Sequence, residues 1–131
     1  MIKINETYTN ESGTLCPIKF DELPFVPQHI FYTKNVPRGG VRGRHAHLKC
    51  EQVLICIRGL INVVMYDGFT HKTLSLRNEQ CAYLPPMVWS QQHFDEDNSI
   101  LLVLSSHPYD ENDYIRDIEI YKQLIMEKSN D

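Results

Sequence analysis

The segment with the richest chemistry is Arg42-Gly43-Arg44-His45-Ala46-His47, which places two histidines two positions apart. Side chains of an extended strand alternate between its faces, so His45 and His47 point to the same side if this segment is a strand. Two imidazoles would then share one small volume. Because imidazole gains and loses a proton near neutral pH, the pair predicts acid–base chemistry or a metal site. A pair of surface histidines on an edge strand is the ordinary alternative.

The elements around this pair are predicted to be short strands from about residue 20 to residue 106. Arg58-Gly59 and Asp67-Gly68 stand between successive apolar runs and predict consecutive hairpins. That many strands at close spacing predict a sandwich or a closed antiparallel barrel. The expected strands cover residues 28–36, 53–57, 60–66, 73–76, 81–84 and 100–105.

The C-terminal part changes to helical spacing. Apolar residues recur there every three or four positions, which is typical of one helical face, and Asp110 is a candidate N-terminal cap. The sequence therefore predicts one helix, over about residues 110–128, packed on the barrel, and a single domain over residues 1–131. The apolar positions are Tyr114, Ile115, Ile118, Tyr121, Leu124 and Ile125.

The composition of the chain limits the classes of molecule that it is expected to bind. The net charge of −4 and the scattered basic residues argue against nucleic acid, although a few arginines can still neutralise one pyrophosphate. The N-terminal residues do not resemble a secretion signal, and no apolar run approaches the length that spans a bilayer. The four cysteines form no C-x-x-C pair. We therefore expect a cytoplasmic protein with reduced, partly buried thiols and no contact with a membrane.

The histidine motif resembles the first conserved motif of the cupin superfamily. Gly39, His45, His47, Gln52 and Gly59 match its intervals, with Gln52 in place of the glutamate ligand. A register that uses Glu51 instead makes the following gap one residue too long. The second cupin motif aligns with residues 85–90 and places Ser90 where the third histidine ligand belongs. The resemblance implies an all-β cupin (jelly-roll) antiparallel barrel with a C-terminal α-helix.

Two of the four usual metal ligands are thus replaced by an amide and a hydroxyl. Divalent transition metals favour three or four imidazole, thiolate or carboxylate donors, so the remaining pair is a poor site. We expect no metal and no other cofactor. An imidazole pair without a metal can still move a proton that is acidified by a neighbouring ketone.

Four motifs in order give a closer resemblance. R-G-x-H-A-H, E-Q-V-L-x-C-x-x-G, P-P-x-V-W and Y-D-E-x-D-Y-I-R resemble the WxcM-like sugar 3,4-ketoisomerases, from about residue 20 to residue 122. The resemblance implies that a dTDP-linked keto sugar, dTDP-4-keto-6-deoxyglucose, is the substrate. It also implies a homodimer with exchanged N-terminal strands and a role in the biosynthesis of deoxy and amino sugars.

The same resemblance implies roles for individual residues. His47 is the favoured base for the proton at C3, His45 holds a sugar oxygen or relays its proton, and Tyr32 is a candidate acid or hydrogen-bonding group. Arg42 is expected to contact phosphate or sugar oxygens, and Ser90 replaces a histidine that is frequent in relatives, which leaves the configuration of the product at C4 open. The expected substrate-binding residues are Arg42, Arg44, Gln52, Ser90 and Trp89.

Two other functions remain open at this point. One is a metal-dependent cupin enzyme that uses His45, His47 and either Glu51 or Gln52. The other is a non-catalytic module that binds a sugar nucleotide, which the change at Ser90 would allow. Solvated or core positions are the ordinary alternatives for Arg44, Trp89 and Tyr32.

Overall fold

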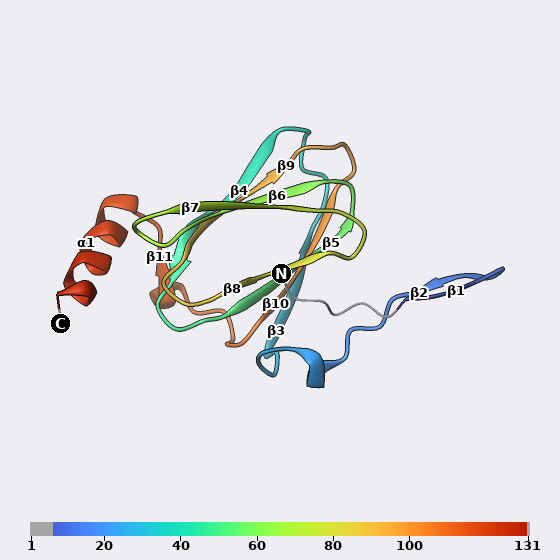
Figure 1. The fold of residues 1–131 in the computed structure, drawn as a ribbon, viewed down its shortest axis with the longest axis horizontal. Coiled ribbons are helices and arrows are strands. Elements are labelled where there is room, and N and C mark those ends of the chain that lie inside the picture. Colours follow the sequence, from blue (N-terminus) through green and yellow to red (C-terminus); the bar gives the residue numbers. More distant parts are fainter. Residues whose placement is uncertain (1–6, 131) are drawn as a thin grey trace.

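The protein is built from two antiparallel sheets that face each other, as seen in a computed structural model that describes residues 7–130. One sheet has the order β3-β10-β5-β8 and the other has the order β11-β4-β9-β6-β7. The predicted jelly roll with one C-terminal helix is confirmed, and it is open like a sandwich instead of being a fully closed barrel (Figure 1). The strands of the first sheet are β3 (His29–Thr33), β10 (Ile100–Ser105), β5 (Gln52–Arg58) and β8 (Cys81–Leu84). Those of the second are β11 (Tyr114–Ile115), β4 (Gly40–His47), β9 (Trp89–Phe94), β6 (Ile61–Tyr66) and β7 (His71–Leu76).

The turns follow the prediction in one of two places. β6 and β7 pair across Asp67-Gly68, which is the predicted hairpin. The hairpin predicted at Arg58-Gly59 is wrong, because β5 pairs with β8 and β10 while β6 pairs with β7 and β9. Gly59 has a φ of +88° and lies so close to Ser99 that a Cβ would be 2.1 Å from its Oγ. This turn therefore carries the chain from one sheet to the other.

The core lies between the two sheets. Its side chains come from alternate positions of both sheets, which is how period-two strands fill a sandwich. Burial of this apolar surface is the main favourable contribution to folding. The members are Leu54, Cys56, Ile61, Val63, Leu76, Ala82, Leu84, Phe94, Leu101 and Val103.

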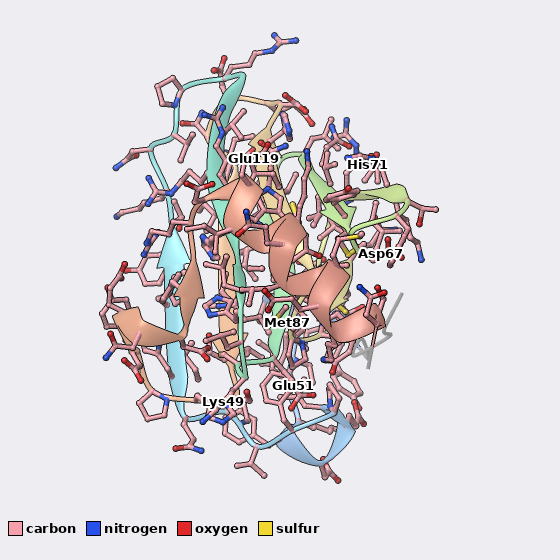
Figure 2. All side chains as sticks on the ribbon, turned by 90° about the vertical axis from the view of Figure 1, so that its left-hand side faces the viewer. Lys49, Glu51, Asp67, His71, Met87 and Glu119 are labelled. Carbon is pink, nitrogen blue, oxygen red and sulfur yellow. The ribbon has the colours of Figure 1, made fainter. Side chains whose placement is uncertain are left out.

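The helix α1 (Ile118–Ser129) covers the outer face of the five-stranded sheet (Figure 2). Its Tyr121 is fully buried with Ala46 and Trp89, and the Tyr121 hydroxyl donates to the carbonyls of Tyr66 and Met87 at 2.9 and 2.8 Å. A buried aromatic ring with a satisfied hydroxyl fixes the helix on the sheet.

The helix begins eight residues later than predicted. Asp117 caps it by accepting from the backbone N–H groups of Glu119 and Ile120. Asp110 caps a separate 3-10 turn, Glu111–Asp113, by accepting from the N–H of Asn112. The next two residues, Tyr114 and Ile115, pair with the edge of β4 as β11. Their apolar spacing satisfied the helical pattern, but tertiary pairing took them into the sheet.

The N-terminal part has a different arrangement. β1 (Tyr8–Asn10) and β2 (Gly13–Leu15) form a hairpin that projects from the end of the molecule opposite α1 (Figure 1). A 3-10 turn, Phe20–Glu22, then leads into β3. Residues 18–25 cover part of the outer face of the four-stranded sheet, with Ile18, Leu23 and Phe25 packed on it.

Two further expectations concern the described residues. Within residues 7–130 none of the four cysteines forms a disulfide, and Cys16 is the partly exposed one among them. Within residues 7–130, no helix is both long and apolar enough to cross a membrane.

Candidate active site

The two histidines of the R-G-x-H-A-H segment lie together on β4. Their ring centroids are 5.0 Å apart, and both rings pack against Tyr114 of β11, at 4.8 and 4.4 Å. The expectation that two imidazoles share one small volume is confirmed. Tyr114 reaches them because β11 places it directly opposite His47 in the register.

A bulge in β4 helps to aim these side chains. The pairing of β4 with β9 shifts between Gly43 and His45, and Gly43 and Arg44 have φ values of +90° and +61°. A Cβ on Gly43 would lie 2.7 Å from Oε1 of Gln92, so the close approach to β9 requires a glycine. A bulge of this kind re-aims a side chain. It turns Arg44 outward and keeps Arg42 and His45 on the inner face.

His45 lines a cavity of about 240 Å³ between the two sheets. One side is polar, with Arg42, Gln52, Gln92 and Arg116, and the other is apolar. A hollow in which several polar groups converge beside apolar side chains can bind a small molecule and fix its orientation. The cavity is lined by Phe31, Thr33, Arg42, Gly43, His45, Gln52, Leu54, Gln92, Phe94, Leu101, Val103, Tyr114 and Arg116.

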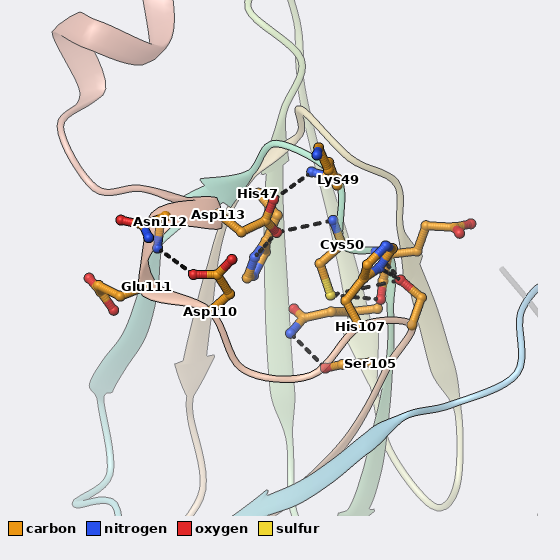
Figure 3. Close-up of polar contacts among 12 residues, drawn as sticks. His47, Lys49, Cys50, Ser105, His107, Asp110, Glu111, Asn112 and Asp113 are labelled. Atoms are coloured by element: carbon orange, nitrogen blue, oxygen red, sulfur yellow. Dashed lines mark hydrogen bonds and ion pairs between the residues drawn. The ribbon is translucent and has the colours of Figure 1, made fainter.

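His47 is held from the opposite side by a carboxylate. Its Nδ1 lies 3.2 Å from Oδ2 of Asp113, and Asp113 also accepts from the backbone N–H groups of Lys49 and Cys50 at 2.8 and 3.1 Å (Figure 3). A carboxylate at Nδ1 favours the tautomer with the proton on Nδ1, which leaves a lone pair on Nε2. His47 itself lines a much smaller crevice behind the cavity.

Both imidazoles are neutral near pH 7. Burial, and next the charge that His47 would carry when protonated, lower the pKa of His45 to about 4. Burial also lowers the pKa of His47, and the Asp113 carboxylate opposes this effect. Nδ1 of His45 and Nε2 of His47 are buried and make no hydrogen bond within residues 7–130. Each ring therefore has a nitrogen available to a bound molecule or to a proton.

Gln52 and Ser90, which stand at two of the metal-ligand positions of the cupin motifs, are neutral and hydrogen-bonded to neighbouring side chains. Gln52 donates from Nε2 to Oγ of Ser105 at 3.1 Å, and Ser90 accepts from Nε2 of Gln92 at 2.9 Å. Glu51 is not an alternative ligand, because it points away and accepts from the hydroxyl of Tyr83 at 2.6 Å. Two imidazoles, an amide and a hydroxyl remain a weak set of metal donors.

A second guanidinium reaches the cavity from the segment after the 3-10 turn. Arg116 lies 4.3 Å over the ring of Tyr114 and pairs with Glu111, with Nε 2.7 Å from Oε1 and Nη2 3.0 Å from Oε2. The hydrogen bond from Arg116 lowers the pKa of Glu111 to about 2, and a contact from the Tyr109 hydroxyl assists. Arg116 is thus oriented by a bidentate partner and an aromatic face.

Three expected site residues lie elsewhere. Tyr32 is 63% exposed on the outer face of β3, because its neighbours Phe31 and Thr33 take the inward positions. Trp89 is buried beneath α1 on the outer face of β9, one residue out of phase with Ser90. Arg44 and Trp89 both line a separate groove beside α1. The structure brings together His45, His47, Arg42 and Gln52, and Ser90 lies opposite His45 in the register.

Sequence reasoning missed Asp113, Tyr114 and Arg116 as site residues. All three belong to the Y-D-E-x-D-Y-I-R motif, but the prediction placed them in a helix. The available signal was the dense polar and aromatic content of that motif next to a histidine pair, which an amphipathic helix on a barrel does not need.

The family model described as FdtA: WxcM-like, C-terminal matches residues 1–126. A TDP-4-oxo-6-deoxy-α-D-glucose-3,4-oxoisomerase from Aneurinibacillus thermoaerophilus is 34% identical over 115 residues, which is 86% of this chain and 83% of that protein.

Solved structures agree with this similarity. The sugar 3,4-ketoisomerase QdtA from Thermoanaerobacterium thermosaccharolyticum, in complex with TDP, matches with a TM-score of 0.88 at 30% identity over 95% of this chain and 92% of that chain. A 3,4-ketoisomerase from Helicobacter canadensis matches with a TM-score of 0.87 at 29% identity, over 94% and 95% of the two chains.

Proposed function

Because the chain belongs to the FdtA (WxcM-like) family, we propose that it is a sugar 3,4-ketoisomerase that acts on dTDP-4-keto-6-deoxyglucose. The observation that carries the proposal is the cavity in which a neutral imidazole with an unpaired nitrogen faces two guanidinium groups. Such a site can remove a proton next to a ketone and stabilise the oxyanion that forms.

The reaction needs only proton movements. A base removes the proton from C3 of the 4-keto sugar, the C3–H electron pair forms a C3=C4 double bond, and the ketone oxygen becomes an enediolate oxygen. That oxygen gains a proton, C4 is then protonated, and the hydroxyl at C3 loses its proton to become the new ketone. One proton leaves C3 and one arrives at C4, so the product is an isomer of the substrate.

The cavity favours His45 as the base that meets C3, in place of His47, which the sequence favoured. His45 lines the cavity, whereas His47 faces the crevice behind it. His47 is oriented by Asp113 and presents a lone pair at Nε2, so it is suited to take up and return a proton in concert with His45. The T-shaped contact between the two rings keeps the pair in a fixed geometry.

The polar side of the cavity suits the oxygens of the sugar nucleotide. We propose that Arg42 and Arg116 contact the enediolate or the phosphates, since guanidinium groups bind such oxygens in pairs. Gln52 and Ser90 are proposed to hold sugar hydroxyls. Arg44, Trp89 and Tyr32 are not among the proposed contacts, because they lie on outer faces.

Incubation with the substrate in D₂O, followed by NMR, tests this function. The wild-type protein is expected to form a 3-keto species that carries deuterium at C4. His45→Asn is expected to reduce the rate by at least about 100-fold while the protein still binds TDP. Binding without exchange by the wild-type protein would identify a sugar-nucleotide module instead. Full activity of His45→Asn would contradict the assignment of the base.

We also propose that the protein is a cytoplasmic homodimer with exchanged N-terminal strands. The β1–β2 hairpin projects from the body and exposes Tyr8 and Leu15, at 53% and 64%. Ile30 and Tyr32 lie exposed on the outer face of β3, at 50% and 63%. A hairpin from a second copy would cover these apolar side chains.

A further inference from the structure

Three potential metal ligands lie on the side of His47 that faces away from the cavity. A ring nitrogen of His47, Sγ of Cys50 and a carboxylate oxygen of Asp113 all lie within 4.8 Å of one another, and Nδ1 is the nitrogen that contacts Asp113. Figure 3 shows the three side chains in one cluster at the end of β4. We propose that this His47–Cys50–Asp113 cluster binds a zinc-like divalent ion, and that the ion inhibits the enzyme by changing the protonation of His47.

The nitrogen–oxygen distance suits a tetrahedral ion, and the sulfur lies within 4.8 Å of both atoms. Nδ1 of His47 and Oδ2 of Asp113 are 3.2 Å apart. Ligands bound at about 2.0 Å to a tetrahedral ion are separated by roughly 3.3 Å. The ion therefore takes the place of the proton that lies between these two atoms.

The sulfur supplies the third ligand. Cys50 is buried, and the contacts of its Sγ are weak: it lies 3.4 Å from the carbonyl of Glu51 and 3.8 Å from Oγ of Ser106. One thiolate, one carboxylate and one neutral imidazole compensate the charge of a divalent ion. A neutral site avoids most of the cost of burying charge. Mixed sulfur, nitrogen and oxygen donors favour Zn²⁺ or Co²⁺ over Mg²⁺.

The cluster is already ordered. The backbone N–H groups of Lys49 and Cys50 hold the Asp113 carboxylate, which is the kind of outer support that orients a metal ligand. The small crevice at this point is also lined by His29, His107 and Asp110. The crevice lies beside the three ligands and, at about 10 Å³, has room for about one small species.

Binding changes His47 in a defined way. An ion on Nδ1 requires that this nitrogen lose its proton, and the neutral ring then carries its proton on Nε2. Nε2 changes from an acceptor into a donor and can no longer take up a proton. The thiol of Cys50 loses its proton to solvent, so about one proton is released per ion.

This cluster differs from the usual cupin centre. The cupin ligands correspond to His45, His47, Gln52 and Ser90, whereas the proposed ion uses the opposite nitrogen of His47 together with Cys50 and Asp113. The binding itself does not depend on the reaction, but the inhibition rests on the proposed ketoisomerase function.

Titration of the metal-free full chain with Co²⁺ tests the binding. The wild-type protein is expected to bind one ion per chain with a thiolate-to-cobalt absorption band and with release of about one proton. Cys50→Ser is expected to lose the band and to weaken binding by at least about tenfold. Cys16→Ser is the matched control, because Cys16 is the more exposed thiol, and it is expected to keep both.

The outcomes separate the site from the reaction. Absence of the band in the wild-type protein, or its loss in Cys16→Ser but not in Cys50→Ser, would overturn the site. If the protein isomerises the sugar, Zn²⁺ is expected to inhibit it, and a chelator is expected to restore activity. Cobalt binding through Cys50 without any isomerase activity would leave the site standing and reject the proposed function. An active enzyme that binds the ion without inhibition would overturn the inhibitory role.

Discussion

At the scale of single residues, the two neighbouring imidazoles differ in what holds them. Each ring keeps one buried nitrogen without a partner within residues 7–130, and Nδ1 of His47 also has a carboxylate partner in Asp113. Asp113 fixes His47 in one tautomer, whereas His45 lines the cavity. This difference supports a division of labour in which one ring meets the substrate and the other supplies or stores a proton.

Asp113→Asn tests the orientation of His47. The amide keeps one acceptor oxygen for the backbone N–H groups, but it can donate to Nδ1 and so favours the wrong tautomer. We expect kcat to fall by about 100-fold with little change in KM, because the group acts on protons and not on binding. Steady-state kinetics measure both parameters. A rise in KM at unchanged kcat would contradict the role.

His45 makes a second prediction at this scale, which concerns acid stability. Its pKa is about 4 in the folded protein, below the ordinary value of 6.5, so the folded state disfavours the charged form. As pH falls from about 6.5 towards 4, the unfolded chain gains a proton that the folded protein does not bind. The contribution of neutral His45 to the free energy of unfolding is therefore fully present above about pH 6.5. It is lost as the pH falls from there towards 4, by about 3 kcal/mol at most.

The measurement compares wild-type protein with His45→Asn by urea denaturation at pH 7 and pH 5, at one protein concentration. The variant is expected to lose less stability between the two pH values, because it has no imidazole to charge. An equal loss in both proteins would show that other groups dominate.

At the scale of elements, the segment between β10 and α1 decides the chemistry. The 3-10 turn and β11 bring Asp113, Tyr114 and Arg116 to the histidines, and α1 then anchors the end of β11 on the sheet. The sequence predicted that the two histidine side chains lie together, and it predicted most strands, because alternation and turn residues are local signals. It could not predict β11, because a two-residue strand is specified by its partner and not by its own pattern.

Faces were harder to predict than strands. Tyr32 lies in a predicted strand and Trp89 begins β9, for which no strand was predicted, and both side chains point outward. A shift of one residue moves a side chain to the opposite face, and the sequence alone did not fix the phase. Arg44 was expected in the binding site but points outward for a related reason, since the bulge at this position interrupts the alternation.

The cap of α1 gives a prediction for this element. Asp117 accepts from two backbone N–H groups at the start of the helix. Asp117→Ala is expected to reduce the free energy of unfolding by about 1 kcal/mol, while the activity of the folded enzyme stays within about twofold. Asp110→Ala is the comparison, because it caps the turn next to the site and is expected to reduce activity. Denaturation and initial rates report the two effects separately.

At the scale of the whole molecule, the exposed hairpin and the exposed face of β3 predict the oligomer. Leu15→Asp together with Tyr32→Asp places charges on two apolar surfaces that a dimer would bury. Light scattering is expected to show a dimer for wild-type protein and a monomer for the double variant. The exposed Met126 on α1 is the control position, and Met126→Asp is expected to leave the dimer intact. A wild-type monomer would reject the exchanged arrangement.

The hydrogen bond between His47 and Asp113 joins residues 66 positions apart in the chain. During synthesis, every strand from β3 to β10 leaves the ribosome before Asp113 does. Among the described strands, only β11 is made after the carboxylate that orients His47. A chain cut short near residue 108 would carry every strand from β1 to β10 without that carboxylate.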